Sequence, residues 1–333
     1  MKRNLLLAVA FLATFTAGAQ NIAVVSPNNV TTIYQTLDEA IAGADNGCIV
    51  YLPGGGFRIK EETLIDKKLT IMGVSHRGDT DNADGATVIG GNLNFVKGAS
   101  GSAVVGVYLS GDINVGTASD SVVNLTVRYC NINSIQVKHP QSSGMVVNQS
   151  YLRNNCNFKG CNARLENNII HSICDVNGGF ISNNVIVNYG SYRRGQYGFS
   201  GSYDIYSCVI IAYNTMISNN ILFSTGRLLQ GSGCQVSDNM VKSENWGDNA
   251  VVLGGADWNA VFEKYNGGAI SPFSKFHLVG DYKQYDNKIG IYGGTGFKDD
   301  TSLAPIPRIV SKKVAEQTDG TGKLKIEVTV KAQ

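Results

Sequence analysis

A short pattern of apolar and polar residues recurs along the middle of the chain. Each copy has an apolar residue, a polar residue, two residues that are usually Asn, and two apolar residues. The copies begin at Val127, Val147, Leu165, Ile181, Ile217 and Val236. The interval from Ile181 to Ile217 is about twice as long as the others, and we expect it to hide one further copy, Ser202-Tyr203-Asp204-Ile205-Tyr206.

This repeat predicts a β-solenoid. A period of roughly 16–20 residues is too short for pairs of helices, and the β-branched apolar positions favour strands. Asn tolerates the left-handed backbone region, so an Asn pair can turn one strand into the next. Stacked coils place equivalent Asn side chains about 4.8 Å apart, where their amides can hydrogen-bond in a ladder. A β-sandwich with Asn-rich turns is the alternative, but it explains no fixed period.

The alignment also predicts which side chains share a face. One column just before the turn is expected to contain Arg128, Asn148, Glu166, Ser182, Ser218 and Ser237. A second column beyond the turn contains Asn133, Arg153 and His171.

The region before the repeats has its own order of elements. Apolar residues at Ile33, Leu37, Ala40 and Ile41 have helical spacing and predict a helix over about 33–42. Three strands are expected after it, over 47–52, 68–73 and 86–91.

These segments carry a family resemblance. The helix followed by "IVYLPGGGF", "KKLTIMG" and "ATVIGG" resembles the N-terminal end of right-handed parallel β-helix proteins of the pectin lyase-like superfamily. The Asn-turn coils extend the resemblance to about residue 245, and the whole is similar to exported β-helix proteins of Bacteroidetes-type bacteria. The resemblance implies an all-β, right-handed, single-stranded parallel β-helix over 20–300, closed at its N-terminal end by the helix.

The last segment of the chain differs from the repeats. The period is lost after Asn239, and the following region is expected to wrap back over the solenoid. Residues 323–331 alternate strictly, with Leu324, Ile326, Val328 and Val330 on one face. This alternation predicts a half-buried strand. It is the second arm of a C-terminal β-hairpin extension within 301–333.

The segment 1–19 is typical of an export signal. Lys2 and Arg3 precede an apolar run from Leu5 to Phe15, and Ala17-Gly18-Ala19 is a small-residue cleavage site. We therefore expect a secreted, periplasmic or cell-surface protein. No later apolar run is long enough for a membrane span. Without Lys2 and Arg3 the chain has 26 basic and 26 acidic residues, which argues against a nucleic-acid partner. A monomer is expected.

Seven cysteines remain after the expected cleavage site. An odd number excludes complete internal pairing, and no zinc-binding spacing occurs. The sequence therefore favours cysteines that are small buried apolar groups, with one disulfide, Cys156 to Cys174, left open.

Two sets of residues could contact a glycan. An Arg beside a His could act as carboxylate clamp and base in β-elimination of a uronic-acid polymer, which makes Arg153 and His171 weak catalytic candidates. Aromatic rings stack on sugars, and Arg binds carboxylate or sulfate. The candidate ligand-binding residues are Tyr192, Arg193, Arg194, Tyr197, Trp246 and Trp258. Solvated surface residues, and Trp side chains that pack in the interior, are the simpler alternatives.

One acidic loop could hold a cation. Asp79, Asp81 and Asp84 could gather calcium through oxygen ligands, although the spacing departs from the EF-hand pattern and a solvated loop is the simpler explanation. No cofactor other than this calcium is expected.

The sequence contains none of the catalytic segments of the enzymes that it resembles. Pectin methylesterases have two Asp motifs; Asp112-Ile113-Asn114-Val115-Gly116 is a faint match to one of them, and the other is missing. The catalytic segments of polygalacturonases and the Arg-x-Pro-x-x-Arg segment of pectate lyases do not occur. The sequence therefore favours a glycan-binding or surface protein without an identified catalytic motif. A polysaccharide lyase, and an adhesin or scaffold, are the alternatives.

Overall fold

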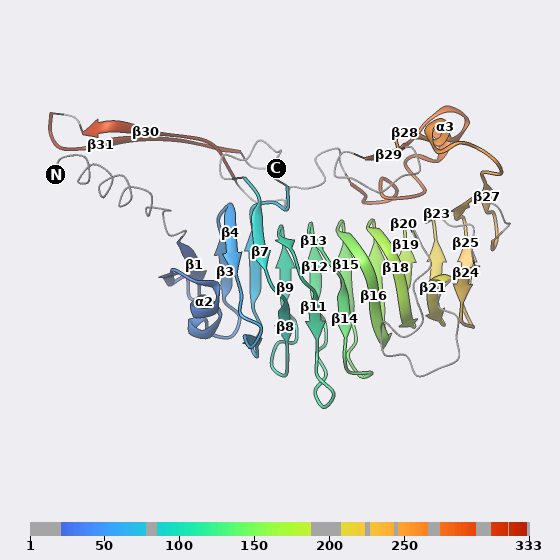
Figure 1. Cartoon of the computed structure of the whole chain (residues 1–333), viewed down its shortest axis with the longest axis horizontal. Helices are drawn as coiled ribbons and strands as arrows, with labels where there is room; N and C mark the ends of the chain where they lie inside the picture. Colours follow the sequence, from blue (N-terminus) through green and yellow to red (C-terminus); the bar gives the residue numbers. More distant parts are fainter. Residues whose placement is uncertain are drawn as a thin grey trace, which may run out of the picture.

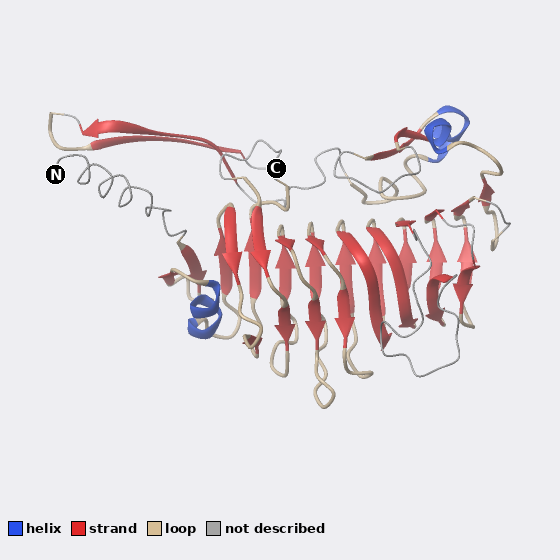
Figure 2. Ribbon diagram, viewed as in Figure 1, coloured by secondary structure: helices blue, strands red, loops and turns tan. Residues whose placement is uncertain are grey.

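The computed structural model is mostly β-structure arranged in large parallel sheets (Figures 1 and 2). It describes residues 21–77, 85–187, 208–223, 227–242, 246–265, 274–297, 308–318 and 320–331.

Two of its sheets contain most of the strands. Sheet A has eleven described strands, in the spatial order β2 (Thr31–Tyr34), β1 (Ile22–Val25), β3 (Ile49–Leu52), β6 (Thr70–Gly73), β9 (Ala103–Val105), β12 (Thr126–Arg128), β15 (Met145–Asn148), β17 (Ala163–Glu166), β19 (Phe180–Ser182), β22 (Met216–Ser218) and β25 (Gln235–Ser237). Sheet B has sixteen, in chain order β4 (Gly55–Arg58), β5 (Leu64–Ile65), β7 (Thr87–Gly90), β8 (Leu93–Phe95), β10 (Tyr108–Leu109), β11 (Ile113–Val115), β13 (Asn131–Ile132), β14 (Ile135–Val137), β16 (Tyr151–Cys161), β18 (Ile169–Asn177), β20 (Val185–Val187), β21 (Cys208–Tyr213), β23 (Ile221–Phe223), β24 (Arg227–Gln230), β26 (Met240–Val241) and β27 (Val251–Val252).

The chain passes from sheet A to sheet B and back in each repeat. From β3 and β4 onward, the strands pair in parallel with the equivalent strand one repeat later, so that β15 pairs β17 and β16 pairs β18. At the N-terminal end of sheet A, β1 pairs antiparallel with β2 and β3. The result is a row of stacked coils, which Figure 1 shows from blue to orange along the chain. This arrangement is compatible with a β-helix. The predicted column from Arg128 to Ser237 is confirmed residue by residue in the pairing register.

The Asn pairs form the turns from sheet A to sheet B. The first residue of each pair has a left-handed backbone, with φ of 53° at Asn167, 56° at Asn183 and 57° at Asn219. The second Asn is turned inward, and this position is fully buried in four coils, at Asn168, Asn184, Asn220 and Asn239.

The buried amides are joined from coil to coil, as the sequence predicts. The backbone N–H of Asn184 donates to Asn220 Oδ1 at 3.0 Å, and the Asn184 side-chain amide donates to the same oxygen at 2.9 Å. The same contacts link Asn168 to Asn184 and Asn220 to Asn239. Each side-chain amide also donates to a backbone carbonyl of the preceding coil, such as Ile181 O for Asn220. The side-chain amides that are buried at the turns therefore all have hydrogen-bond partners within the protein.

The long step in the repeat joins strands that are direct neighbours in both sheets. β19 pairs directly with β22 and β20 with β23, so Asn184 and Asn220 are neighbours in the ladder. The expected copy at 202–206 lies outside the described residues.

The helix near the N-terminus is shorter than predicted. α2 spans Leu37–Gly43, and Ile33 lies instead in strand β2. Thr36 caps the helix because its hydroxyl accepts from Glu39 N while the Glu39 carboxylate accepts from Thr36 N. Leu37, Ala40 and Ile41 are buried and belong to the main hydrophobic core. The three strands predicted after the helix correspond to β3, β6 and β7.

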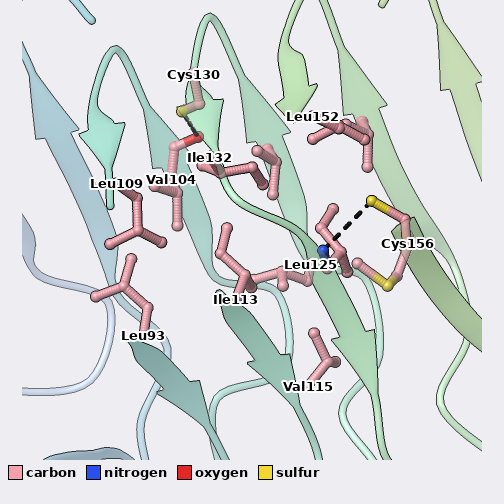
Figure 3. Packing of buried hydrophobic residues seen from close by; sticks show 14 of the residues in the cluster. Leu93, Val104, Leu109, Ile113, Val115, Leu125, Cys130, Ile132, Leu152 and Cys156 are labelled. Carbon is pink, nitrogen blue, oxygen red and sulfur yellow. Dashed lines mark hydrogen bonds between the residues drawn. The ribbon is translucent and has the colours of Figure 1, made fainter. Parts of the chain in front are cut away.

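The core fills the space between the two sheets. Leu93, Ile113 and Ile132 are fully buried and come from successive coils (Figure 3). Val104 O accepts from the thiol of Cys130 at 3.5 Å, so this cysteine packs within the same core.

The cysteines are mainly core residues, as expected. Cys48, Cys130, Cys156 and Cys161 are buried thiols, and the disulfide between Cys156 and Cys174 is not formed. Burial raises the pKa of the Cys130 and Cys156 thiols to about 12. These thiols therefore remain protonated, and they are poor nucleophiles at neutral pH.

The segment after the last coil covers part of the outer face of sheet B. It contains α3 (Trp258–Val261), β28 (Phe262–Lys264), β29 (Lys275–Leu278) and the 3-10 helix η2 (Gly280–Tyr285). Their apolar residues pack with Val185, Ile221 and Met240 from sheet B in a second hydrophobic cluster.

Turn residues hold the chain that follows this segment. The Asn167 amide donates to Gly293 O at 2.8 Å, and the Asn183 amide donates to Lys288 O at 2.6 Å. The predicted return of the chain over the coils is confirmed for these residues.

The final strands β30 (Arg308–Thr318) and β31 (Leu324–Lys331) pair antiparallel as a separate two-stranded sheet. The expectation of a half-buried strand at 323–331 is wrong, because Ile326 and Val330 are 59% and 57% exposed. Strict alternation fixes which residues share a face of a strand, but it does not supply a partner for that face.

The ladder predicts a specific loss of stability. Replacing Asn220 by Ala (Asn220→Ala) removes the acceptor of the Asn184 backbone N–H and the amide that donates to Ile181 O and Asn239 Oδ1, while the Asn184 side-chain amide keeps its bonds to Leu165 O and Ser182 O. Because an unsatisfied buried group costs about 1–3 kcal/mol, we expect the free energy of unfolding to fall by roughly 3 kcal/mol or more. Urea unfolding followed by circular dichroism measures this change.

Ser218→Ala is the matched control, since Ser218 lies on the outer face of the same coil. Its free energy of unfolding should stay within about 0.5 kcal/mol of the parent. Equal losses in the two variants would show that the buried amides have no special part in stability.

Candidate functional site

A row of amide side chains crosses the outer face of sheet B. Strands alternate their side chains between faces, so Leu93, Ile113 and Ile135 are buried while the residues beside them face outward. The register aligns Asn94 with Asn114 and Asn114 with Gln136. The Asn114 amide donates to Asn94 Oδ1 at 2.9 Å. A second, outer row of amides thus runs along the coils.

A polar pocket of about 320 Å³ opens beside this row. It is lined by Asp112, Asn133, Ser134, Gln136, Lys138, Asn154 and Asn155. These residues come from the stretches before β11, around β14 and within β16, which stacking brings together from three coils.

The carboxylate of Asp112 organises one side of the pocket. Its Oδ1 accepts from Asn133 Nδ2 at 2.8 Å and from the Ser134 hydroxyl at 2.7 Å. Its backbone N–H donates to Asn92 Oδ1 at 2.8 Å. The carboxylate is therefore held by two donors of the following coil, while Asn92 of the preceding coil fixes the Asp112 backbone. Such fixing reduces the cost of ordering the carboxylate around a ligand.

Hydrogen bonds continue from this carboxylate across the pocket. Gln136 Nε2 donates to the Ser134 hydroxyl oxygen at 2.8 Å and to Asn155 O at 3.0 Å. Asn155 Oδ1 accepts from the Ser172 hydroxyl and lies 3.1 Å from His171 Nδ1. The network leads from Asp112 to His171 through Ser134, Gln136 and Asn155, and it passes through the backbone carbonyl of Asn155. Such a connected set is more rigid than isolated surface side chains.

The guanidinium of Arg153 makes hydrogen bonds within the protein. Its NH1 donates to Asn131 Oδ1 at 3.0 Å, and its NH2 donates to Leu109 O at 2.8 Å and Ser110 O at 3.1 Å. The guanidinium also lies over the Tyr108 ring, 4.5 Å from its centroid. Arg153 therefore extends towards the preceding coils and stabilises their packing.

His171 lies on the neighbouring coil. The register pairs Leu152 with Ile170, so Arg153 and His171 directly follow matched residues, and a register shift comes before Asn155. The predicted neighbourhood of the two backbones is thus present, but the side chains have different partners. Burial lowers the pKa of the His171 imidazole, which makes the neutral form dominant at neutral pH.

The two Trp residues pack against the protein. The ring centroids of Trp258 and Phe223 are 4.2 Å apart, with the rings edge to face. Lys242 Nζ lies 4.9 Å from the centroid of the Trp258 ring. Trp246 packs against the main core. Neither Trp lines the pocket beside Asp112.

Several predicted site residues fall outside the described part of the chain. These are the glycan candidates Tyr192, Arg193, Arg194 and Tyr197 and the calcium candidates Asp79, Asp81 and Asp84. Among the residues that the structure describes, no group of three His, Cys, Asp or Glu side chains is placed to hold a metal ion.

Of the pocket residues, only Asn133 belongs to a column predicted from the repeats, but the others also follow a pattern in the sequence. Asp112-Ile113-Asn114 repeats the pattern of Asn92-Leu93-Asn94 one coil later, and Ser134-Ile135-Gln136 follows in the same register. Each is polar, apolar, polar, with no Asn-Asn turn beside it. A search for outward-facing polar positions with the period of the turns would have found them.

The comparisons with known proteins give no relative. No family model, curated protein or solved structure matches the chain. Over the described residues, none of the helices is long and apolar enough to cross a membrane.

The environment of His171 predicts a dependence of stability on pH. The folded state has the lower pKa, so the unfolded chain binds a proton first as the pH falls below the ordinary value of 6.5. Stability should therefore be lost as the pH decreases below about 6.5. Replacing His171 by Asn (His171→Asn) should make this loss smaller.

Urea unfolding of parent and variant at pH 7.5 and pH 5 measures the difference. An NMR titration of the His171 ring should give a midpoint below the ordinary pKa of 6.5. A midpoint at or above that value would contradict the burial of this imidazole.

Proposed function

We propose that this chain is an exported, right-handed parallel β-helix that binds a glycan on the outer face of sheet B. In this proposal α2 closes the N-terminal end of the solenoid and β30 with β31 forms a C-terminal hairpin extension. The segment 1–19 directs export to the periplasm or cell surface, and the protein acts as a monomer.

The observation that carries the proposal is the connected polar pocket beside Asp112. Amide side chains both donate and accept hydrogen bonds, as sugar hydroxyls do. The pocket presents the amides of Asn133, Gln136, Asn154 and Asn155 together on a rigid sheet. Because each coil adds about 4.8 Å to the row, the outer amide row offers successive polar contacts to an extended chain of sugars.

A second candidate function is β-elimination of a uronic-acid polymer. The lowered pKa of His171 favours it, since a general base must be unprotonated at the working pH. The hydrogen bonds of Arg153 to Leu109 O and Ser110 O weigh against it, because they occupy donors that would bind the substrate carboxylate. Binding without turnover is therefore the better-supported function.

Affinity electrophoresis against plant, algal and host polysaccharides tests the proposal. We expect one or more polymers to retard the protein without being degraded. Gln136→Ala should weaken that retention roughly fivefold to tenfold, the equivalent of one or two hydrogen bonds of about 1 kcal/mol. Tyr192→Ala tests the additional contact expected from the segment 189–197.

Gln235→Ala is the matched control, because Gln235 is exposed on sheet A. It should leave retention unchanged. Equal effects of Gln235→Ala and Gln136→Ala would place the binding surface elsewhere. Release of unsaturated sugars that absorb in the ultraviolet, lost in His171→Ala, would establish the lyase instead. A protein that shows neither behaviour would be a scaffold or an adhesin that recognises no glycan.

A further inference from the structure

We infer that the pocket beside Asp112 selects uncharged, hydroxyl-rich sugar units and rejects units that carry a carboxylate or sulfate. This inference rests on the proposed function and adds the class of ligand. The inference depends on three charged residues. Asp112 and Lys138 line the pocket, and Arg153 lies nearby with its guanidinium bound to other parts of the protein.

The pocket contains a fixed negative charge. Asp112 lines it, and the Asn133 and Ser134 donors that approach Oδ1 hold the carboxylate in position. A carboxylate or sulfate brought into contact with it would be repelled, because two like charges at a protein surface are screened less than in bulk water. A hydroxyl has no net charge, and it can donate a hydrogen bond to this carboxylate.

The nearby guanidinium does not offset this charge for a ligand. Arg153 uses NH1 and NH2 on Asn131, Leu109 and Ser110, and the group lies over Tyr108. These bonds use three of the five guanidinium N–H donors and hold the group against the two preceding coils, so an anionic sugar in the pocket would have to draw Arg153 away from them. Arg153 is also absent from the pocket lining.

Among the lining residues, Lys138 carries the positive charge, and its position limits its effect. Its side chain is exposed to solvent after β14. An exposed ion pair contributes little to binding, because water and salt screen it, whereas the Asp112 carboxylate is held in place by its neighbours. The remaining lining residues are amides and a hydroxyl, which match neutral sugar hydroxyls in both donor and acceptor roles. The balance of charge therefore favours neutral units.

Paired polymers that differ only in charge test this inference. The probes are polygalacturonate, alginate and hyaluronan, each compared with its carboxyl-reduced derivative, in which the carboxylate is replaced by a primary alcohol. In affinity electrophoresis of the full chain we expect at least one reduced polymer to bind tenfold or more tightly than its acidic parent. No pair should show the opposite preference.

Replacing Asp112 by Asn (Asp112→Asn) keeps an acceptor for Asn133 and Ser134 and removes the charge. It should reduce the tenfold preference to threefold or less. Asp175→Asn is the matched control, because Asp175 lies on β18, does not line the pocket and has a positive φ of 61° that Asn tolerates. This variant should keep the full preference. Circular dichroism confirms that both variants are folded.

Two results would overturn the inference while leaving glycan binding intact. One is an acidic parent that binds as tightly as its reduced form or more tightly. The other is a preference for the reduced form that Asp112→Asn does not change. If no polymer of the three pairs and of the wider polysaccharide panel retards the folded protein, the proposed function fails, and this inference fails with it.

Discussion

The structure depends on the satisfaction of buried amides at one corner of the coils. A chain that turns inside a stack of strands must bury polar backbone groups, and each such group left without a partner costs about 1–3 kcal/mol. Asn168, Asn184, Asn220 and Asn239 solve this problem together, because the side-chain oxygen of one accepts from the backbone and the side chain of the Asn before it. No single coil can do so alone. The turns therefore make stacking cooperative and fix the register of both sheets.

That register determines where the surface side chains lie. Asp112, Gln136 and Asn155 are far apart in sequence, yet the pairing of β11, β14 and β16 places them around one pocket. The position of Arg153 over Tyr108 follows from the same stacking. A rigid sheet can hold such groups more precisely than a loop, which suits recognition by several weak polar contacts.

The fold could largely be predicted from the sequence because its signals are local and repeated. Two adjacent Asn residues between apolar residues specify the turn, and the period reveals the stack. α2 begins later than the apolar spacing predicts, because Ile33 pairs in β2 and the cap at Thr36 starts the helix at Leu37. The doubled spacing between Ile181 and Ile217 does not separate their strands in the stack, because β19 pairs directly with β22.

The candidate site was harder to predict. The pair Arg153 and His171 was expected from the repeat register, and the backbones are indeed neighbours. Arg153, however, donates to acceptors on the preceding coils, and these bonds determine where its guanidinium lies. Sequence patterns show which residues face outward, but they do not show which donors are already occupied. The same limit applies to β31. The alternation of its residues shows which side chains share a face, but it does not show whether another part of the protein covers that face.

Hydrogen exchange at the turns tests the central account most directly. Turn amides at a protein surface ordinarily exchange quickly, whereas the backbone N–H groups of Asn168, Asn184 and Asn220 donate to buried side-chain oxygens. We predict that NMR-detected exchange of these three amides is as slow as that of the central strand amides of β17 and β18. Exchange as fast as that of an exposed loop would contradict a ladder of buried amides, and with it the stacking on which the pocket depends.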